Sequence, residues 1–274
     1  MSKKIFAAAL FATTALIAVS GTASAQSRPV PDALDVSVVG SAPNYRPSLN
    51  STDIAIGAQY GDRNYGEQVQ VNGSQADPNK AAIYQGAEPG RIFGIPVISH
   101  NANDNRAYQY QNGQGNTAVI NQTGDRNYAR QTSYGVKNTA VAVQEGYSNN
   151  STQYQNGTNN NGYVLQGKFA SNNTTNQSQV GTGNVAGSWQ QGDNSIVIQD
   201  QIGTNDTAVA YQTALSDANT IDQQQHGSYH YAFASQDGDR NVVSQTQGAG
   251  FGLSVVKQFG DNNTFKVGQG AGIR

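Results

Sequence analysis

The segment Asn116–Asn127 reads NTAVINQTGDRN, and the segment Asn138–Asn149 reads NTAVAVQEGYSN. Each begins with Asn, carries Gln six residues later, and has Gly two residues after that Gln. From Asp53 onward the chain divides into 18 such units, most of them 11 residues long; 13 begin with Asn and 17 carry the Gln. Self-similarity at a short fixed period indicates a repeat architecture.

The fourth residue after the start of each unit reveals a longer period. It is Gln at Gln109 and Gln131, but apolar at Ile120 and Ala142, and this alternation continues along the chain. The full repeat therefore has about 22 residues in two 11-residue halves. Side chains alternate along a strand, so the Asn, the apolar residue and the Gln of a half share one face. Gly, Asp and Asn fill the last four places of the halves, as in tight turns.

These patterns predict an all-β fold, a β-solenoid of stacked strand-turn-strand repeats with about 22 residues per rung and cross-β stacking in a fibre. An 11-residue period also suits a right-handed helical supercoil. The repeated turn-forming Gly and the scarcity of Leu argue against that alternative.

Stacked repeats place equivalent residues one strand spacing apart, about 4.8 Å. A buried amide without a partner costs about 1–3 kcal/mol, and in register its partner is the same residue one rung away. We therefore expect each Asn and each Gln side chain to donate to the next one along the axis. The expected Gln ladder comprises Gln111, Gln122, Gln144, Gln155, Gln166, Gln179, Gln190, Gln201, Gln212, Gln225, Gln236, Gln247, Gln258 and Gln269. The expected Asn ladder comprises Asn105, Asn116, Asn127, Asn138, Asn149, Asn160, Asn173, Asn184, Asn219, Asn241 and Asn263.

The N-terminus has the three parts of a secretory signal peptide. Lys3 and Lys4 precede an apolar run over 5–19, and the small-residue site Ala-Ser-Ala ends at Ala25. We expect residues 1–25 to be the signal peptide, with cleavage after Ala25. A membrane anchor fits less well because the apolar run is short. The sequence thus predicts an exported protein.

The rest of the chain divides by its prolines, all seven of which lie between residues 29 and 96. Residues 26–52 are interpreted as a flexible Pro-containing leader and 53–75 as a first repeat. Residues 76–104 are expected to form an irregular Pro-containing insertion with one half-unit, Asn79–Gln85. Residues 105–274, which contain no Pro, are expected to form the main solenoid because every strand there must pair on both sides.

Composition excludes several function classes. The net charge is -2 and charged residues make up 12%, so a nucleic-acid partner is not expected. There is no Cys to form disulfides. Of the three His residues, His226 and His230 are four apart, but no acidic or Cys cluster accompanies them or His100. We interpret them as exposed turn residues and expect neither a metal site nor a cofactor.

The pattern N-x-A-x-x-x-Q-x-G-x-x-N closely resembles the curlin repeat. It is complete in Asn116, Ala118, Gln122, Gly124 and Asn127, and the resemblance extends over about residues 53–274. Curlins are the subunits of curli, the extracellular amyloid fibres of bacterial biofilms.

The resemblance implies a β-solenoid subunit that assembles with itself into cell-surface fibres. It also implies passage through the periplasm, an outer-membrane secretion channel with accessory proteins, and a nucleator or main-subunit paralogue as partner. In the family the leader addresses the subunit to that channel; an unstructured tail is the alternative. The chain departs from the family in having about nine full repeats, and in carrying Ser133 and Lys168 where Gln and Gly are expected.

Several interpretations remain open. The main fibre subunit is favoured over a minor nucleator, for which the basic Lys257, Lys266 and Arg274 would be suited. A monomeric secreted adhesin or other binding module is the second class, although neither a regular Thr array for ice nor a calcium-binding G-G-x-G-x-D repeat is present.

An enzyme is the third class and is not expected. The repeated Asp residues lie in turns, and in the sequence Gly-Asp-Arg-Asn each is followed by Arg. Asp125, Arg126, Asp239 and Arg240 are interpreted as solvated turn charges or as gatekeepers that slow self-association before export.

Overall fold

The computed structural model describes residues 53–59, 62–71, 73, 77–86, 90–92, 95–97, 102–214, 216–248 and 250–270. The expected signal peptide with Ala25, the leader 26–52 and His100 lie outside the described residues. Within the described part of the chain, no helix is long and apolar enough to cross a membrane.

The described chain forms two parallel sheets of nine strands each. Sheet A contains, in order of pairing, β1 (Ile54–Gln59), β3 (Lys80–Gln85), β7 (Thr117–Gln122), β9 (Thr139–Gln144), β11 (Asn161–Gln166), β13 (Val185–Gln190), β15 (Thr207–Gln212), β17 (Tyr231–Asp237) and β19 (Leu253–Phe259). Sheet B contains β2 (Tyr65–Val71), β6 (Arg106–Gln114), β8 (Tyr128–Val136), β10 (Asn150–Thr158), β12 (Thr174–Thr182), β14 (Ile196–Thr204), β16 (Thr220–Ser228), β18 (Val242–Gln247) and β20 (Thr264–Gln269).

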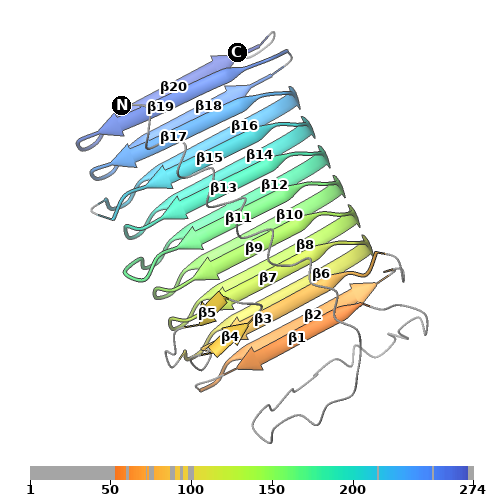
Figure 1. Ribbon diagram of the computed structural model, residues 1–274. Coiled ribbons are helices and arrows are strands. Elements are labelled where there is room, and N and C mark those ends of the chain that lie inside the picture. The colour runs from red at the N-terminus through yellow and green to blue at the C-terminus, as the bar shows by residue number, and fades with distance from the viewer. Residues whose placement is uncertain are drawn as a thin grey trace, which may run out of the picture.

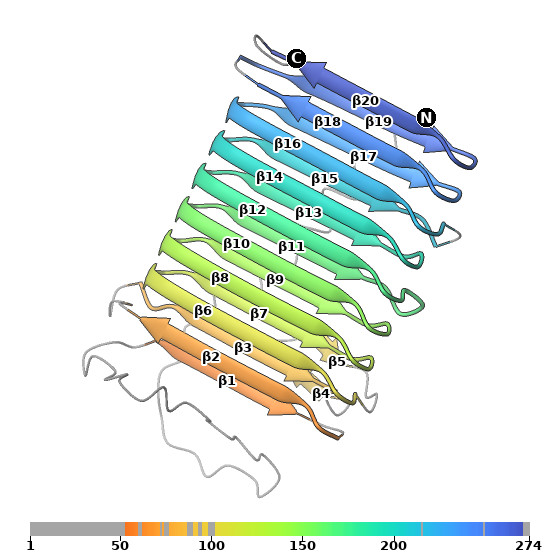
Figure 2. The same ribbon diagram turned by 180° about the vertical axis from the view of Figure 1, so that it is seen from behind.

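Each rung of the solenoid is one strand of sheet A followed by one strand of sheet B. Successive rungs stack in register from the first rung (β1 and β2) to the ninth (β19 and β20), as Figures 1 and 2 show from the two sides. Equivalent residues such as Gln122 and Gln144 are paired directly. The prediction of an all-β solenoid with about 22 residues per rung is confirmed.

Burial follows the period of two that the sequence predicts. In β7 the residues Ala118, Ile120 and Gln122 are buried and point inward, while Thr117 and Val119 alternate with them on the outer side. The interior is thin, because each rung supplies only a few small apolar side chains besides its amides. These side chains form two clusters; the first contains Ile83, Ala107, Ile120, Ala129, Ala142 and Val164, and the second contains Val197, Ala210, Ile221, Ala234, Val243 and Val256.

The geometry of the turns accounts for two positions of the repeat: the Gly, and the residue that precedes each unit-starting Asn. The backbones of successive turns approach so closely that a Cβ on Gly135 would lie 2.1 Å from the carbonyl oxygen of Gly157. The residue that precedes the unit-starting Asn adopts a left-handed conformation, with φ of 57° at Arg126 and 53° at Arg240. This conformation reverses the chain direction before the next strand begins.

The segment 76–104 contributes one strand to the stack, at the half-unit Asn79–Gln85 that the repeat pattern identifies. Its half-unit forms β3, which pairs with β1 on one side and β7 on the other and so completes sheet A. Between β3 and β6 the described part of the chain leaves the stack. That excursion contains a short antiparallel pair, β4 (Gly90–Ile92) and β5 (Ile95–Val97). β3 itself contains no Pro, so none of its backbone donors is missing from the ladder, whereas Pro96 lies in β5.

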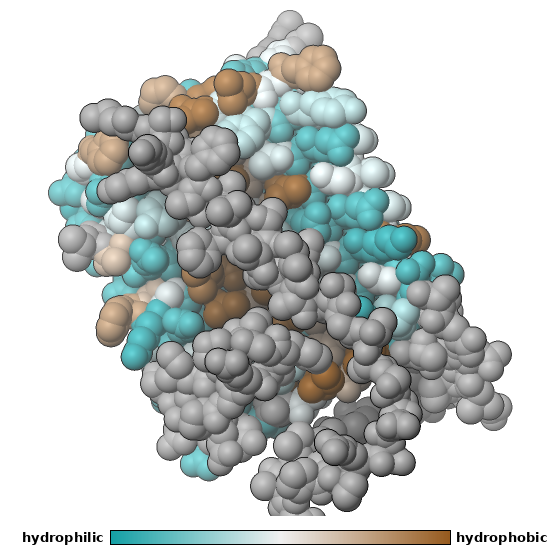
Figure 3. Space-filling view, viewed as in Figure 1, coloured by the Kyte–Doolittle hydropathy of each residue, from teal (hydrophilic) through white to brown (hydrophobic). Residues whose placement is uncertain are grey.

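The two outer faces differ in polarity. On sheet A the third residue after the unit start is apolar in most rungs, at Ile56, Ala82, Val119, Val141, Tyr163, Val209, Phe233 and Val255. On sheet B the same column is mostly polar, at Glu67, Arg130, Thr152, Asn176, Asp222, Ser244 and Lys266. Figure 3 shows hydrophobic residues gathered in the middle of one face of the solenoid.

Candidate functional site: the amide ladders

The Gln residues that end the strands of sheet A form a hydrogen-bonded column. Gln122 Nε2 donates to Gln144 Oε1 at 2.8 Å, and Gln144 Nε2 donates to Gln166 Oε1 at 2.8 Å. The second hydrogen of each amide crosses to the opposite sheet; that of Gln144 goes to the carbonyl of Tyr128 at 2.9 Å. Each side chain therefore joins one rung to the next and one sheet to the other.

This sheet A column has one interruption. Gln190 donates to the backbone carbonyls of Thr174 and Ser195, and its Oε1 accepts from the hydroxyl of Thr175. The Oε1 of the next member, Gln212, is buried without a hydrogen-bond partner. The column resumes at once, because Gln212 Nε2 donates to Gln236 at 3.1 Å.

The Gln column at the equivalent position of sheet B runs from Gln155 through Gln179 and onward to Gln269. Ser133 interrupts it, as the sequence suggested. Its side chain is buried, and its hydroxyl donates to Gln155 Oε1 at a long 3.2 Å. Gln111 on the other side donates to the backbone of Lys80.

A third column, two residues earlier in sheet B, is the most regular of all. Its members are Gln68, Gln109, Gln131, Gln153, Gln177, Gln199, Gln223 and Gln245, each donating to the next at 2.8–3.0 Å. The sequence analysis used these residues to find the 22-residue period but did not include them in the ladder. The sequence signal for this column was the alternation of Gln with apolar residues such as Ile120 and Ala142 at the fourth place of successive units. The apolar residues lie on the inner face of sheet A, which must leave room for the Gln side chains of sheet B.

The Asn residues are buried in columns, but the expected bonding pattern between them was wrong. Asn127 Oδ1 accepts from the backbone N–H of Asn149 at 2.9 Å, and its Nδ2 donates to the carbonyl of Gly146 at 2.9 Å. The same arrangement recurs at most expected positions. Asn is one methylene shorter than Gln and follows a left-handed residue, so its amide reaches the adjacent turn backbone instead of the next side chain.

Five of the 18 unit-starting positions hold another residue, namely Asp53, Ser195, Asp206, His230 and Gly252. Ser195 accepts the backbone N–H of Asn219 at 3.3 Å. Asp206 Oδ1 accepts both the backbone N–H of His230 and its ring Nδ1, each at 2.9 Å. His230 is 2% exposed, so its interpretation as an exposed turn residue was wrong. Gly252 holds the next place in this column, and the missing side chain there leaves space for the imidazole.

His226 also differs from the sequence interpretation. It lies in β16 rather than in a turn, on the outer face, with Nε2 3.9 Å from Asp200. His226 is therefore exposed on the outer face of sheet B, whereas His230 is buried just before β17 of sheet A. Within the described residues, no group of three or more His, Asp or Glu side chains could hold a metal ion.

The turn carboxylates form a hydrogen-bonded column of their own beside the amide ladders. Asp239 Oδ1 accepts the backbone N–H of Asp217 at 2.9 Å, and Asp261 accepts that of Asp239 at 2.8 Å. Asp125 in the same way accepts the backbone N–H of Asn103. Asp125 and Asp239 are partly exposed and Asp261 is exposed, yet these carboxylates hold successive turns together.

The neighbouring Arg side chains lie along the axis rather than on their own Asp. Arg126 contacts Tyr147 of the next rung, with its guanidinium 5.3 Å from the ring centroid. Arg240 Nε donates to Asn262 at 2.8 Å. Both contacts are exposed, so each contributes little to stability.

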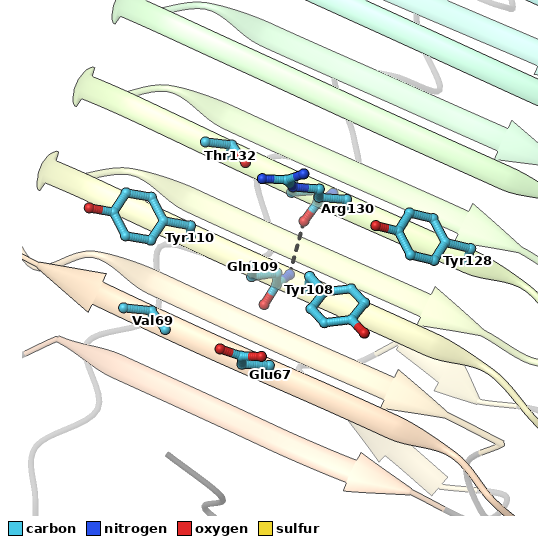
Figure 4. Close-up of a pocket in the computed structure, with 9 residues that line it drawn as sticks. Glu67, Val69, Tyr108, Gln109, Tyr110, Tyr128, Arg130 and Thr132 are labelled. Carbon is cyan, nitrogen blue, oxygen red and sulfur yellow. Dashed lines mark hydrogen bonds between the residues drawn. The ribbon is translucent and has the colours of Figure 1, made fainter. Parts of the chain in front are cut away.

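Aromatic residues line a shallow depression on the outer face of sheet B, shown in Figure 4. Tyr108 and Tyr128 lie 5.7 Å apart between ring centroids, next to Arg130 and Glu67. The two rings are tilted by 43°, and aromatic pairs at this distance add about 0.5–1.5 kcal/mol beyond the area that they bury. They reinforce the first rungs, where the interior is least filled.

The fold and its columns define a class: a parallel β-solenoid of nine rungs whose interior is dominated by hydrogen-bonded Gln and Asn ladders. Comparisons of the chain with protein-family models, with curated proteins and with solved structures found no match. The 22-residue repeat and its buried ladders are compatible with curlin-like repeats.

Proposed function

We propose that this protein is the main structural subunit of extracellular, curli-type amyloid fibres, and that it assembles with itself by continuing its ladders from one molecule to the next. The carrying observation is that the two Gln columns at the strand ends have members in every rung but one and reach both ends of the stack, at Gln59 and Gln70 in the first rung and at Gln258 and Gln269 in the ninth. β1 and β2 at one end, and β19 and β20 at the other, have no further pairing partner among the described strands. An open sheet edge of this kind is a template for another chain.

The energetics favour assembly over a solitary monomer. Each internal rung satisfies its buried amides through the rungs on both sides, whereas an end rung has one neighbour only. A missing bond to a buried amide costs about 1–3 kcal/mol, and several columns end together at each tip. Stacking a second molecule restores these bonds along with a full set of backbone hydrogen bonds.

The biological setting comes from the curlin resemblance and the N-terminal pattern. The proposal places the mature chain at the cell surface, reached through a Sec signal peptide, the periplasm and an outer-membrane channel with accessory proteins. A nucleator paralogue would start growth, and the fibre would serve the biofilm matrix and adhesion. The role is structural, without a catalytic step or a cofactor.

Assembly kinetics test the proposal. Purified mature chain is incubated with thioflavin T, with and without sonicated fibre seeds. We expect a lag phase that seeds abolish; a chain that stays monomeric with an intact β spectrum would contradict fibre formation and favour a solitary binding module.

Val141→Pro is the matched variant in the middle of the stack. It removes a backbone donor from β9, which pairs on both sides. Fibre growth from this variant is expected to fail, whereas Ser41→Pro in the Pro-containing leader is expected to leave growth unchanged.

A further inference from the structure

We propose that the Tyr residues on the outer face of sheet B are a site of oxidative cross-linking, at which two neighbouring phenol rings become joined by a carbon–carbon bond as dityrosine. The modification goes beyond the fibre-forming function proposed above, because it takes place between rungs of one molecule and needs no second copy. It supplies a covalent link between rungs in a chain that has no Cys. The inference rests on the spacing of the rings, on their exposure and on a proton acceptor beside one of them.

Six Tyr rings on this face form two zigzag columns over the first four rungs. The first column contains Tyr65, Tyr108 and Tyr128, and the second contains Tyr110, Tyr134 and Tyr154. Successive ring centroids are 5.4 and 5.7 Å apart in the first column, and 5.5 and 6.0 Å apart in the second. Figure 4 shows Tyr108 and Tyr128 on one side of the depression and Tyr110 on the other. Every ring therefore has another phenol as its neighbour in the next rung.

The zigzag follows from the register of the strands. In the pairing of β6 with β8, Tyr110 lies opposite Thr132 and Tyr134 lies opposite Asn112, so the two rings are diagonal neighbours. Diagonal neighbours on one face of a sheet remain within reach of aromatic side chains. The two ring planes are tilted by 49°, so the rings are not stacked flat on each other. Because both side chains lie on the solvent side of the sheet, rotation about their side-chain bonds can bring two ring carbons into contact.

Each column contains a ring that an oxidant in solution can reach. Tyr65 is 45% exposed and Tyr134 is 37% exposed, whereas the rings next to them are partly buried. A one-electron oxidant therefore forms a phenoxyl radical first at Tyr65 or Tyr134. The neighbouring ring is close enough to pass an electron to that radical, after which the exposed ring can be oxidised again. Two radicals then stand side by side in one column.

Tyr65 also has a proton acceptor in place. Its hydroxyl donates to Glu67 Oε2 at 3.0 Å, and this hydrogen bond raises the pKa of the Tyr65 phenol. The phenol is therefore neutral at neutral pH, and it must lose a proton together with the electron when it is oxidised. Loss of the electron makes the phenol strongly acidic, and Glu67 receives the proton in the same step. Tyr65 is thus the most readily oxidised ring of the first column.

The overall reaction balances with a peroxide oxidant. Each of two phenols gives up one electron and one proton, and the two radicals join through the carbons ortho to their oxygens. The hydrogen on each of these carbons then moves to the phenol oxygen of the same ring, which restores the aromatic system. In total, two carbon–hydrogen bonds break and one carbon–carbon bond forms. Hydrogen peroxide, acting through a peroxidase, takes up the two electrons and two protons and is reduced to two water molecules.

The link would stabilise the rungs where the chain makes its excursion from the stack. Tyr65 of β2 and Tyr108 of β6 are neighbours in space, but β3 and the segment between β3 and β6 separate them in the sequence. A covalent bond between them closes that loop and restricts the unfolded chain, as a disulfide does. The second column extends the linked region to β10 in the fourth rung.

Three other Tyr residues of the same chain serve as internal references. Tyr147, Tyr229 and Tyr231 are each at least as exposed as Tyr134. In the part of the chain that the structure describes, none of the three contacts the ring of another Tyr, and the ring next to Tyr229 is that of Phe251. If exposure alone decided the reaction, these residues would be among the first to couple. The zigzag columns predict that they are not.

Peptide mapping of the oxidised chain tests the proposal. An equal mixture of isotopically labelled and unlabelled mature chain, with its β spectrum verified, is treated with a peroxidase and a limiting amount of hydrogen peroxide and is then digested. Mass spectrometry identifies dityrosine as two peptides joined with the loss of two hydrogen atoms. We expect four links, each between peptides of the same isotopic composition: Tyr65 to Tyr108, Tyr108 to Tyr128, Tyr110 to Tyr134, and Tyr134 to Tyr154.

Tyr134→Phe is the most informative variant, because it keeps the ring in the second column and removes only the hydroxyl that the oxidation requires. We expect both links of the second column to be lost and both links of the first column to remain. Tyr147→Phe removes a similarly exposed phenol that has no Tyr neighbour, and it is the matched control. All four links should remain in this control.

Three results would overturn the proposal. The first is dityrosine distributed over Tyr147, Tyr229 and Tyr231 according to their exposure. The second is a folded chain that forms no link under these conditions. The third is a set of links that join labelled to unlabelled peptides, because these would show coupling between molecules instead of between rungs.

Discussion

Gln144 stands between two identical side chains: it accepts a hydrogen bond from Gln122 Nε2 and donates one to Gln166 Oε1, both at 2.8 Å. Replacing it with Ala leaves a hydrogen of Gln122 and the oxygen of Gln166 without their ladder partners in a buried interior. We expect Gln144→Ala to lower the free energy of unfolding by about 1–3 kcal/mol. Thr139→Ala, on the outer face of the same strand, should cost much less, and chemical denaturation compares the two. Equal losses would show that the ladder is not a principal source of stability.

Ser133 provides the reverse experiment, because it leaves a gap between Gln111 and Gln155 in sheet B. Ser133→Gln would place an amide where both neighbours have one, completing the column. We expect a gain of about 1 kcal/mol, the net contribution of a typical hydrogen bond. Ser133→Ala, which adds no amide and removes the long hydroxyl bond to Gln155, is the control and should not gain stability. A loss of stability in the Gln variant would mean that the column has closed around the smaller side chain.

The raised pKa of the Asp222 carboxyl group predicts how the free energy of unfolding depends on pH. Asp222 is half-buried on the outer face of sheet B, and desolvation raises the pKa of its carboxyl group, with a smaller contribution from Asp200. A raised pKa in the folded state means that stability is fully present below the usual pKa of Asp and declines as pH rises through the raised value. Asp222→Asn should therefore be more stable than the wild type at pH 7, and similar to it near pH 3. An equal difference at both values would contradict a titration effect.

Two substitutions of Asp239 test separately whether its charge delays assembly and whether its hydrogen bond holds the turns together. Asp239→Asn keeps an oxygen that can accept the backbone N–H of Asp217 but removes the charge. We expect a shorter lag phase with unchanged fibre stability, and high salt should shorten the wild-type lag in the same direction. Asp239→Ala removes the acceptor as well and should weaken the fibres. A longer lag in the Asn variant would eliminate the gatekeeper role.

The sequence predicted the strands and the Gln columns because these depend on local signals. Alternation of period two identifies the inner face of Thr117–Gln122, and Gly with Asp or Asn in the following residues identifies the turn. Once 22-residue units stack in register, the column of Gln122 and Gln144 follows without any further information.

The predictions that failed have a common physical cause. Each concerned a side-chain contact that is decided by a difference of one or two bond lengths. Asn127 occupies its predicted column, but its shorter side chain bonds to the backbone rather than to Asn149. His230 starts a repeat unit and is buried against Asp206. The sequence analysis considered it together with His226, four residues earlier, and so did not recognise its place in the Asn column.

X-ray diffraction from aligned fibres of the mature chain tests the central claim most directly. If rungs of successive molecules continue one stack, the strands lie perpendicular to the fibre axis and give a reflection at about 4.7–4.8 Å along it. The account predicts this axial reflection from seeded wild-type fibres. Fibres with the same β content but with that spacing perpendicular to the axis would contradict the stacking of rungs along the fibre.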